Sequence, residues 1–269
     1  MMHRLWTGLL LVLFPWITFS QSSSHRAFRP GERVEYKAYY NWGFIWIHAG
    51  KIRFTVEQEN LDNQRAFRLN AYGRSLKSYD WIFKVRDQFQ SVVREEDLTP
   101  LHFVRDTYEG GYAVDNRYRF DHQRQKIYTQ VDNSKEAYQE DTLDFDPPVY
   151  DVLTAIYQAR NLDFSQYSID EKIPLPLIID NEIYELYLRY QGKERIKIRK
   201  DRHYNCIKFS AMLVEGTIFS GGEHLTVWVT DDKNHIPVMV KAKILVGSVK
   251  AILKATHNLK HPSVLSEQY

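Results

Sequence analysis

The residues with the clearest potential for metal binding lie between positions 224 and 235. His224 and His235 flank Asp231 and Asp232 there, so a site of two imidazoles and one carboxylate can be drawn. The run DDKNH is also ordinary polar turn sequence, and the chain contains no HExxH motif. We therefore predict no metal site and no cofactor.

Nucleophilic chemistry has no clear signature in this sequence. The chain contains no serine elbow and no glycine-rich phosphate loop. Ser220 stands beside two glycines at a spacing that fits no nucleophile motif, and Cys206 lies in an alternating run typical of a strand. The paired carboxylates Glu95 and Glu96 are of a kind common on protein surfaces, and acid-base work would require two such groups to converge in a cleft. The sequence favours a protein that is not an enzyme, with hydrolase activity as a less favoured alternative.

Aromatic residues are the most concentrated chemical feature of the chain. Five of them fall within the eight positions from Tyr39 to Trp46. Rings at such density either fill a core or line a binding site. We predict that some line the rim of an apolar ligand site, together with two rings from a possible helical turn at residues 75–83. The predicted ligand-binding residues are Trp42, Phe44, Trp46, Trp81 and Phe83.

A second candidate binding surface is cationic. Lys193, Arg195, Lys197 and Arg199 alternate with isoleucines, so one face of the expected strand is uniformly basic. This face is either a solvated surface that discourages edge-to-edge pairing of sheets, or a site for an anionic partner such as a lipid headgroup or an acidic glycan.

The elements that must position these residues are mostly strands, because apolar residues recur with period two along most of the chain. In the segment 44–57, Phe44, Trp46, Ile52 and Phe54 are expected to share one apolar face, and His48 falls on it too. One helix is expected at residues 147–160, capped by Asp146. Further strands are expected at residues 34–40, 66–71, 88–93, 101–107, 112–120, 126–131, 182–190, 195–200, 206–214, 224–231, 236–246 and 248–255.

The balance between strands and helix predicts the fold class. A single short helix cannot cover the apolar face of ten or more strands. The uncovered sheet must curl on itself or leave a groove. We therefore predict a mainly β protein, a single strongly curved antiparallel sheet or open barrel with one principal helix, and an apolar cavity beside that helix.

The first twenty residues have the features of a secretory signal. Arg4 precedes an apolar stretch, residues 5–19, that is shorter than the roughly twenty residues of a membrane span. A retained anchor is the alternative. We predict a signal peptide at residues 1–20, a flexible leader at 21–29, one β-rich domain at 30–257 and a tail at 258–269, with no transmembrane span after signal removal. The expected location is the periplasm or the extracellular space.

Composition narrows the class of partner. The chain has 36 Lys and Arg against 34 Asp and Glu, and this near-neutral balance argues against a nucleic-acid partner. Cys206 is the only cysteine, so no internal disulfide can form and stability must come from packing.

Three separated blocks carry a family resemblance. The runs GERVEYKAYYNWGFIWIHAGKI, DFDPPVYDVLTAIYQAR and LTVWVTDDKNHIPVMVKAKILVGSVKAIL occur in this order, and over roughly residues 28–255 the chain resembles the exported bacterial proteins grouped as domain of unknown function 3108. The resemblance implies a Gram-negative envelope setting and one antiparallel β domain. More distantly, the chain looks like the half-barrels of lipoprotein carriers, which hold acyl chains in an apolar concavity. No catalytic residue follows from the resemblance.

Together these observations predict an exported envelope protein that binds an apolar or amphipathic ligand of the lipid or lipoprotein type without catalysis. The alternative from another class is an interaction or assembly scaffold of the envelope, which would dock another envelope protein through its aromatic edge.

Overall fold

The computed structural model describes residues 26–42, 45–199, 202–215, 220–244 and 247–265. In this part of the chain, fourteen strands form one antiparallel sheet. Its first half contains β1 (Arg33–Trp42), β2 (Ile45–Leu61), β3 (Gln64–Ser75), β4 (Val85–Arg94), β5 (Pro100–Glu109), β6 (Tyr112–Asp121), β7 (Lys126–Asn133) and β8 (Gln139–Asp144). After the helix α1 (Val152–Arg160), the second half contains β9 (Lys172–Pro174), β12 (Tyr187–Arg199), β13 (Arg202–Glu215), β14 (Ser220–Thr230), β15 (Pro237–Lys243) and β16 (Ser248–His257).

The two halves meet where β1 pairs with β16, from Arg33 opposite His257 to Tyr40 opposite Val249. The strand order is β8-β7-β6-β5-β4-β3-β2-β1-β16-β15-β14-β13-β12-β9, so β8 and β9 stand at the ends and the sheet is not closed. The short strands β10 (Leu177–Ile179) and β11 (Glu182–Tyr184) pair separately. The 3-10 turns η1 (Lys77–Tyr79) and η2 (Phe164–Gln166) complete the elements.

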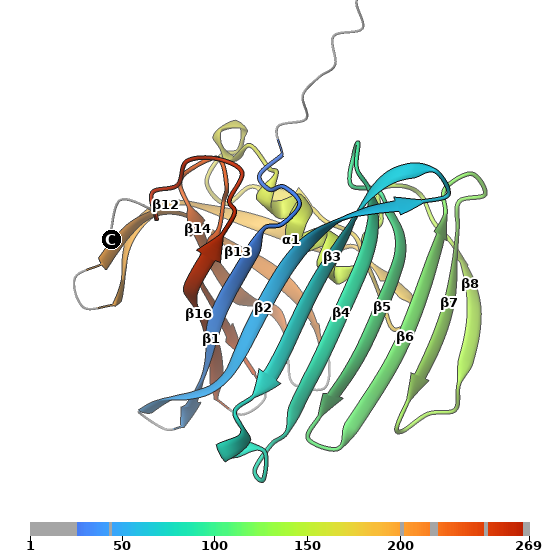
Figure 1. Cartoon of the computed structure of the whole chain (residues 1–269), viewed down its shortest axis with the longest axis horizontal. Coiled ribbons are helices and arrows are strands. Elements are labelled where there is room, and N and C mark those ends of the chain that lie inside the picture. The colour runs from blue at the N-terminus through green and yellow to red at the C-terminus, as the bar shows by residue number, and fades with distance from the viewer. Residues whose placement is uncertain (1–25, 43–44, 200–201, 216–219, 245–246, 266–269) are drawn as a thin grey trace, which may run out of the picture.

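The sheet is strongly curved around α1. In Figure 1, β1 to β8 form the wall toward the viewer, β12 to β14 pass behind them, and α1 lies between. We call the face of the sheet that is turned toward α1 the inner face. The predicted fold class, a mainly β chain with one curved or open-barrel sheet and one principal helix, is confirmed.

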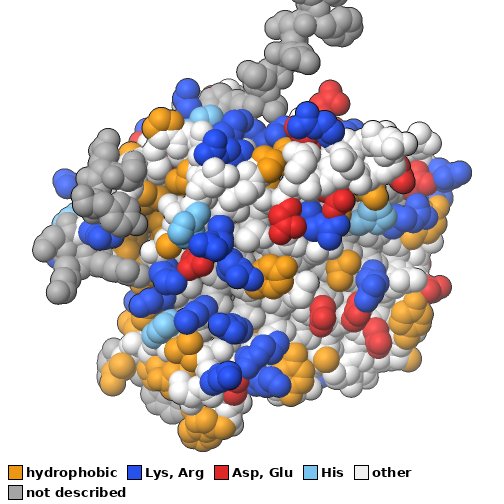
Figure 2. All heavy atoms as spheres, viewed as in Figure 1, with side chains coloured by type: hydrophobic (Ala, Val, Ile, Leu, Met, Phe, Trp, Pro, Cys, Tyr) orange, Lys and Arg blue, Asp and Glu red, His pale blue; other side chains and the backbone are white. Residues whose placement is uncertain are grey.

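Alternation of side chains explains how these strands form a core. In β6, Val114, Tyr118 and Phe120 are buried on the inner face, while Arg117 and Arg119 between them are exposed. Charged and polar side chains cover much of the outer face of this half of the sheet (Figure 2). The largest core cluster lies between these strands and α1, and includes Phe67, Leu69, Val93, Leu153 and Tyr157.

The helix begins later than the sequence indicated. It runs over Val152–Arg160, and Asp151, not Asp146, caps it by accepting hydrogen bonds from the amides of Leu153 and Thr154. Tyr150, just before it, forms a β-bridge with Leu177, and its amide donates to the Pro176 carbonyl. No helix in the described part of the chain has the length and apolarity needed to cross a bilayer.

Residues near both ends of the described chain contact the β-rich domain. Ala27 and Phe28, expected in a flexible leader, are buried, and the Phe28 ring packs against Tyr157 with ring centroids 4.7 Å apart. Beyond residue 257, Leu265 packs against the core and the His261 carbonyl accepts a hydrogen bond from Asn234 at 3.1 Å. Residues of the predicted leader and of the predicted tail thus pack against the β-rich domain. The predicted signal peptide lies outside the described residues.

Candidate ligand-binding cavity

An apolar cavity of about 310 Å³ lies between α1 and the inner face of the sheet. Its wall comes from α1, from β1 and β2, from β12 to β16, and from the segment that contains β10 and β11. The volume is at the lower end of the roughly 300–1,000 Å³ that is typical of ligand pockets. Residues of the wall include Tyr36, Phe54, Ile156, Phe209, Met212 and Val240.

The cavity exists because the helix is too small for the sheet that surrounds it. Strand alternation makes the inner faces of β13 and β14 apolar, with Phe209 and Ala211 on one strand and Leu225, Val227 and Val229 on the other. The side of α1 that meets this wall includes the small residues Ala155 and Ala159. Small side chains there leave space that the sheet does not fill.

Burial falls along the strands in one direction, which shows where the cavity opens. On β1, Val34 and Tyr36 are buried, whereas Ala38 and Tyr40 on the same face are half-buried. On β13 the same change occurs between Phe209 and Leu213, and Ile156 of α1 remains 38% exposed. The cavity therefore opens toward the edge of the sheet that carries the β1–β2 connection, the lower edge in Figure 1.

The opposite end is closed by a buried ion pair. The Arg160 guanidinium donates to both carboxylate oxygens of Glu32, at 2.6 and 3.1 Å, and to the Asn234 carbonyl at 3.2 and 3.1 Å. Burial raises the pKa of the phenols of Tyr36 and Tyr157 beside this pair, so both stay neutral. Neither phenol hydroxyl has a hydrogen bond to another described residue.

The wall offers little for catalysis. Among the described residues that line the cavity, Arg160 is the only charged one, and Glu32 neutralises it. The described part of the lining includes no serine, cysteine, histidine, aspartate or glutamate that could act as nucleophile or general base. The cavity suits a hydrocarbon held by burial of apolar surface.

A family model described as "Protein of unknown function (DUF3108)" matches residues 35–254, most of the chain. The chain belongs to the DUF3108 family. Among solved structures, the chain is similar to a β-barrel-like protein of the domain of unknown function DUF1849 from Brucella abortus, with a TM-score of 0.53 and 10% identity over 84% of this chain and 97% of that one. This likeness shows the fold. No curated protein matches the chain.

Within this DUF3108 fold, three described members of the predicted aromatic rim, Trp46, Trp81 and Phe83, are not among the residues that line the cavity. Trp46 and His48 were expected on the face of Ile52 and Phe54, but a bulge reverses the alternation: Ala38 pairs with Gly50 and Tyr39 with His48, so Ala49 is an extra residue. The Trp46 ring therefore lies on the outer face, with the Lys250 ammonium 3.9 Å from its centroid.

The other predicted ligand-binding aromatic residues lie away from the cavity or outside the described part of the chain. Trp81 and Phe83 are exposed in the β3–β4 connection. Trp42 belongs to β1, but its side chain is outside the described part, as is the whole of Phe44. Ile52 and Phe54, which shared the predicted apolar face, do line the cavity.

Most of the wall was missed because it is assembled from segments distant in sequence. Leu177 begins β10 and Leu186 follows β11, and both line the same cavity as Tyr36 because the sheet is curved. One available signal was the alternation of Leu225, Val227 and Val229. Nothing in a single sequence shows which two apolar faces will oppose each other.

The cationic strand is β12. Lys193, Arg195 and Lys197 are exposed and alternate with buried Ile196, as predicted, whereas the Arg199 side chain is outside the described part. Lys193 forms an ion pair with Asp231 at 2.7 Å. The binding of an anionic partner to this face stays a prediction.

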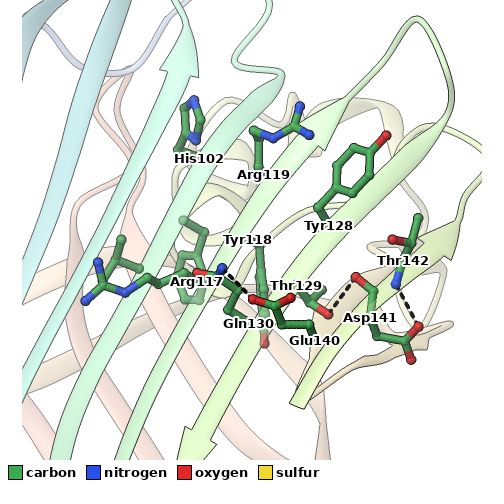
Figure 3. Close-up of a pocket in the computed structure, with 12 residues that line it drawn as sticks. His102, Arg117, Tyr118, Arg119, Tyr128, Thr129, Gln130, Glu140, Asp141 and Thr142 are labelled. Atoms are coloured by element: carbon green, nitrogen blue, oxygen red, sulfur yellow. Dashed lines mark hydrogen bonds between the residues drawn. The ribbon is translucent and has the colours of Figure 1, made fainter. Parts of the chain in front are cut away.

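A larger, open groove of about 790 Å³ lies along β5 to β8. In Figure 3, His102 and Arg119 lie at one end of this groove, and Glu140 and Asp141 lie at the other. Glu140 accepts a hydrogen bond from Gln130 at 3.1 Å. The His102 imidazole has no hydrogen bond to a carboxylate of another described residue, and we place the candidate site in the apolar cavity instead.

The other chemical candidates do not assemble either. No group of three or more metal-ligating side chains occurs among the described residues. The His235 imidazole is hydrogen-bonded to the Arg160 carbonyl at 2.7 Å, and Asp232 accepts from the Thr230 hydroxyl at 2.8 Å. Burial raises the pKa of the Cys206 thiol to about 12, which suppresses the reactive thiolate.

One carboxyl on the inner face should respond to pH. Burial, aided by the nearby Glu109, raises the pKa of Asp87 to about 7, and its Oδ1 has no hydrogen-bond partner among the described residues. Because the folded pKa lies above the unfolded value of about 3.9, the wild type loses stability as pH rises from about 4 to 7.

We expect Asp87→Asn to raise the free energy of unfolding by about 2 kcal/mol relative to the wild type at pH 8, and to leave it nearly unchanged at pH 4. Urea titrations at both pH values measure this. An equal gain at both would mean that Asp87 does not titrate in this range.

Proposed function

We propose that this chain is an exported envelope protein that binds one apolar or amphipathic molecule, such as an acyl chain, in the cavity beside α1 and performs no chemistry on it. The observation that carries the proposal is the cavity itself, which is apolar, open at one edge of the sheet and closed at the other by the Arg160–Glu32 pair. Export is supported by the signal-like first twenty residues.

The composition of the wall supports an acyl chain in particular. Burial in an apolar cavity is non-directional, so a site whose wall is mostly aliphatic and aromatic selects mainly for hydrophobicity and size. A headgroup, if present, would remain at the open edge, where the inner-face residues are half-buried.

The proposal is tested by filling the cavity. Ala211 lines it from β13 and is half-buried. We expect Ala211→Trp to weaken binding of a fluorescent fatty acid at least about tenfold, because the indole occupies the volume that the acyl chain needs. The matched control is Thr226→Trp, which adds an indole to the outer face of β14 and should bind as the wild type does.

Native protein supplies the second measurement. Mass spectrometry after organic extraction should find an acyl-containing molecule bound to the wild type and depleted in the Ala211→Trp variant. A clean extract, together with no saturable binding of the fluorescent fatty acid, would contradict the proposal. Co-purification of an envelope protein in that case would favour the scaffold alternative.

A further inference from the structure

Four large apolar side chains stand in solvent at the edge of the sheet where the cavity opens. Ile45, the first residue of β2, is 68% exposed, and the β3–β4 connection carries Trp81, Ile82 and Phe83 at 82%, 51% and 46%. Both connections lie at the lower edge in Figure 1. An exposed apolar group of this kind marks an interaction surface.

The β3–β4 connection is held in one conformation. The Ile82 and Phe83 amides donate to the Tyr79 carbonyl at 3.0 and 3.1 Å, and Asp80 forms an ion pair with Arg86. The Trp81 indole donates to the Ser78 carbonyl at 3.0 Å. The Phe83 ring lies against Gly110 of the β5–β6 turn, where any Cβ would clash with it. The fold therefore presents these apolar side chains to solvent in fixed positions.

Cations surround the apolar tip. Lys51, Arg74, Lys77 and Lys84 are exposed at this edge, and none forms an ion pair with another described residue. The acidic Asp80 among them is already paired with Arg86. Figure 2 shows hydrophobic side chains at the lower edge of this face and Lys and Arg side chains directly above them. The surface is thus apolar at its tip, and the four cations outnumber the acidic residues Asp80, which is paired, and Glu109, which ends β5 opposite Val85.

We infer that this edge docks on the anionic surface of a lipid bilayer, with Trp81, Ile82 and Phe83 among the headgroups and the four cations above them. Tryptophan favours the interface between headgroups and hydrocarbon. Each basic residue near an anionic surface strengthens binding about fivefold, and peripheral anchoring takes an apolar and a basic signal together. The unpaired cations favour an anionic bilayer over an uncharged apolar protein surface. Docking in this orientation would turn the mouth of the cavity toward the membrane.

The test uses the mature protein and vesicles of phosphatidylcholine with or without phosphatidylglycerol, in a flotation assay. We expect binding to the phosphatidylglycerol vesicles, with a blue shift of tryptophan fluorescence, and binding at least about tenfold weaker on neutral vesicles or at high salt. Trp81→Ser and the double variant Lys77→Glu/Lys84→Glu should each reduce binding. The control Ile169→Ser removes another exposed apolar residue, 68% exposed, that lies outside this edge, and should bind normally.

The outcomes separate this inference from the proposed function, which it goes beyond. Ala211→Trp should lose the fatty acid and still bind anionic vesicles, because its substitution lies inside the cavity. Equal binding of Trp81→Ser, the charge-reversed variant and the control would overturn the inference, as would equal binding to neutral and anionic vesicles. Saturable capture of an envelope protein by the wild type but not by Trp81→Ser, without vesicle binding, would assign the edge to a protein partner instead.

Discussion

Replacing Arg160 by Met is expected to lower the free energy of unfolding by about 3 to 5 kcal/mol, because it leaves the Glu32 carboxylate buried without a counter-charge. Glu32 is 1% exposed and Arg160 5%, and the guanidinium also satisfies the Asn234 carbonyl. Urea denaturation at neutral pH measures the loss. The effect should be one of the largest for any single substitution in this chain, since it combines an unpaired charge with lost hydrogen bonds.

A double-mutant cycle separates the pair from its parts. Glu32→Leu alone leaves the buried Arg160 guanidinium without a counter-charge. Glu32→Leu together with Arg160→Met replaces both charges by apolar side chains of similar size. We expect the double variant to be more stable than either single variant, with a coupling energy of at least about 2 kcal/mol. Additive losses would show that the two charges do not depend on each other, and that the closed end of the cavity is held by packing alone.

The Arg160–Glu32 pair also shows where sequence reasoning reaches its limit. The curved sheet and its cavity were predictable, because they follow from the strand alternation and from the shortage of helix. The partner of Arg160 was not, because Glu32 is 128 positions away and the two meet only when α1 enters the concavity. A long charged side chain at the end of a predicted helix is normally expected to be exposed to solvent. Only the assembled fold shows that Arg160 is buried.

The misplaced aromatic residues have a local cause. Period-two reasoning carried Trp46 and His48 onto the inner face, and one extra residue at Ala49 reversed them. The sequence does signal irregularity at Gly50, whose Cα approaches the Arg74 carbonyl so closely that a Cβ there would lie 2.7 Å from it. It does not show on which side of the glycine the extra residue falls. A register change of one residue moves every later side chain to the other face.

The observed positions of the aromatic residues divide them between the cavity and the outside of the sheet. Ile52 and Phe54, beyond the bulge, face the cavity, whereas Trp46 lies outside under Lys250 and Trp81 extends from the neighbouring connection. The aromatic residues of the sequence therefore serve two surfaces at the same edge. If both proposals above hold, a ligand would enter and leave the cavity at the membrane surface, because the cavity opens at the edge that carries the apolar side chains and the cations.

The second large effect is expected at the start of α1. Asp151 is fully buried and its carboxylate accepts four hydrogen bonds: from the Ser91 hydroxyl at 2.5 Å, from the Leu153 and Thr154 amides at 3.0 and 2.9 Å, and from the Thr154 hydroxyl at 2.6 Å. We expect Asp151→Ala to lower the free energy of unfolding by about 3 kcal/mol. Loss of the cap accounts for about 1 kcal/mol, and the buried hydroxyls left without an acceptor account for the rest.

Asp151→Asn is the matched control, because it keeps one oxygen acceptor for the amides and the Ser91 hydroxyl. Burial raises the pKa of the Asp151 carboxyl, although the four hydrogen bonds act to lower it. The charged form therefore carries a desolvation cost that the neutral amide avoids. We expect Asp151→Asn to cost about 1 kcal/mol, and Ser91→Ala, which leaves the cap intact, to cost a similar amount. Guanidinium denaturation ranks the three variants. If Asp151→Ala costs no more than Asp151→Asn, the helix is held in the concavity by its apolar side chains alone, and the bond from β4 to the helix start contributes nothing to stability.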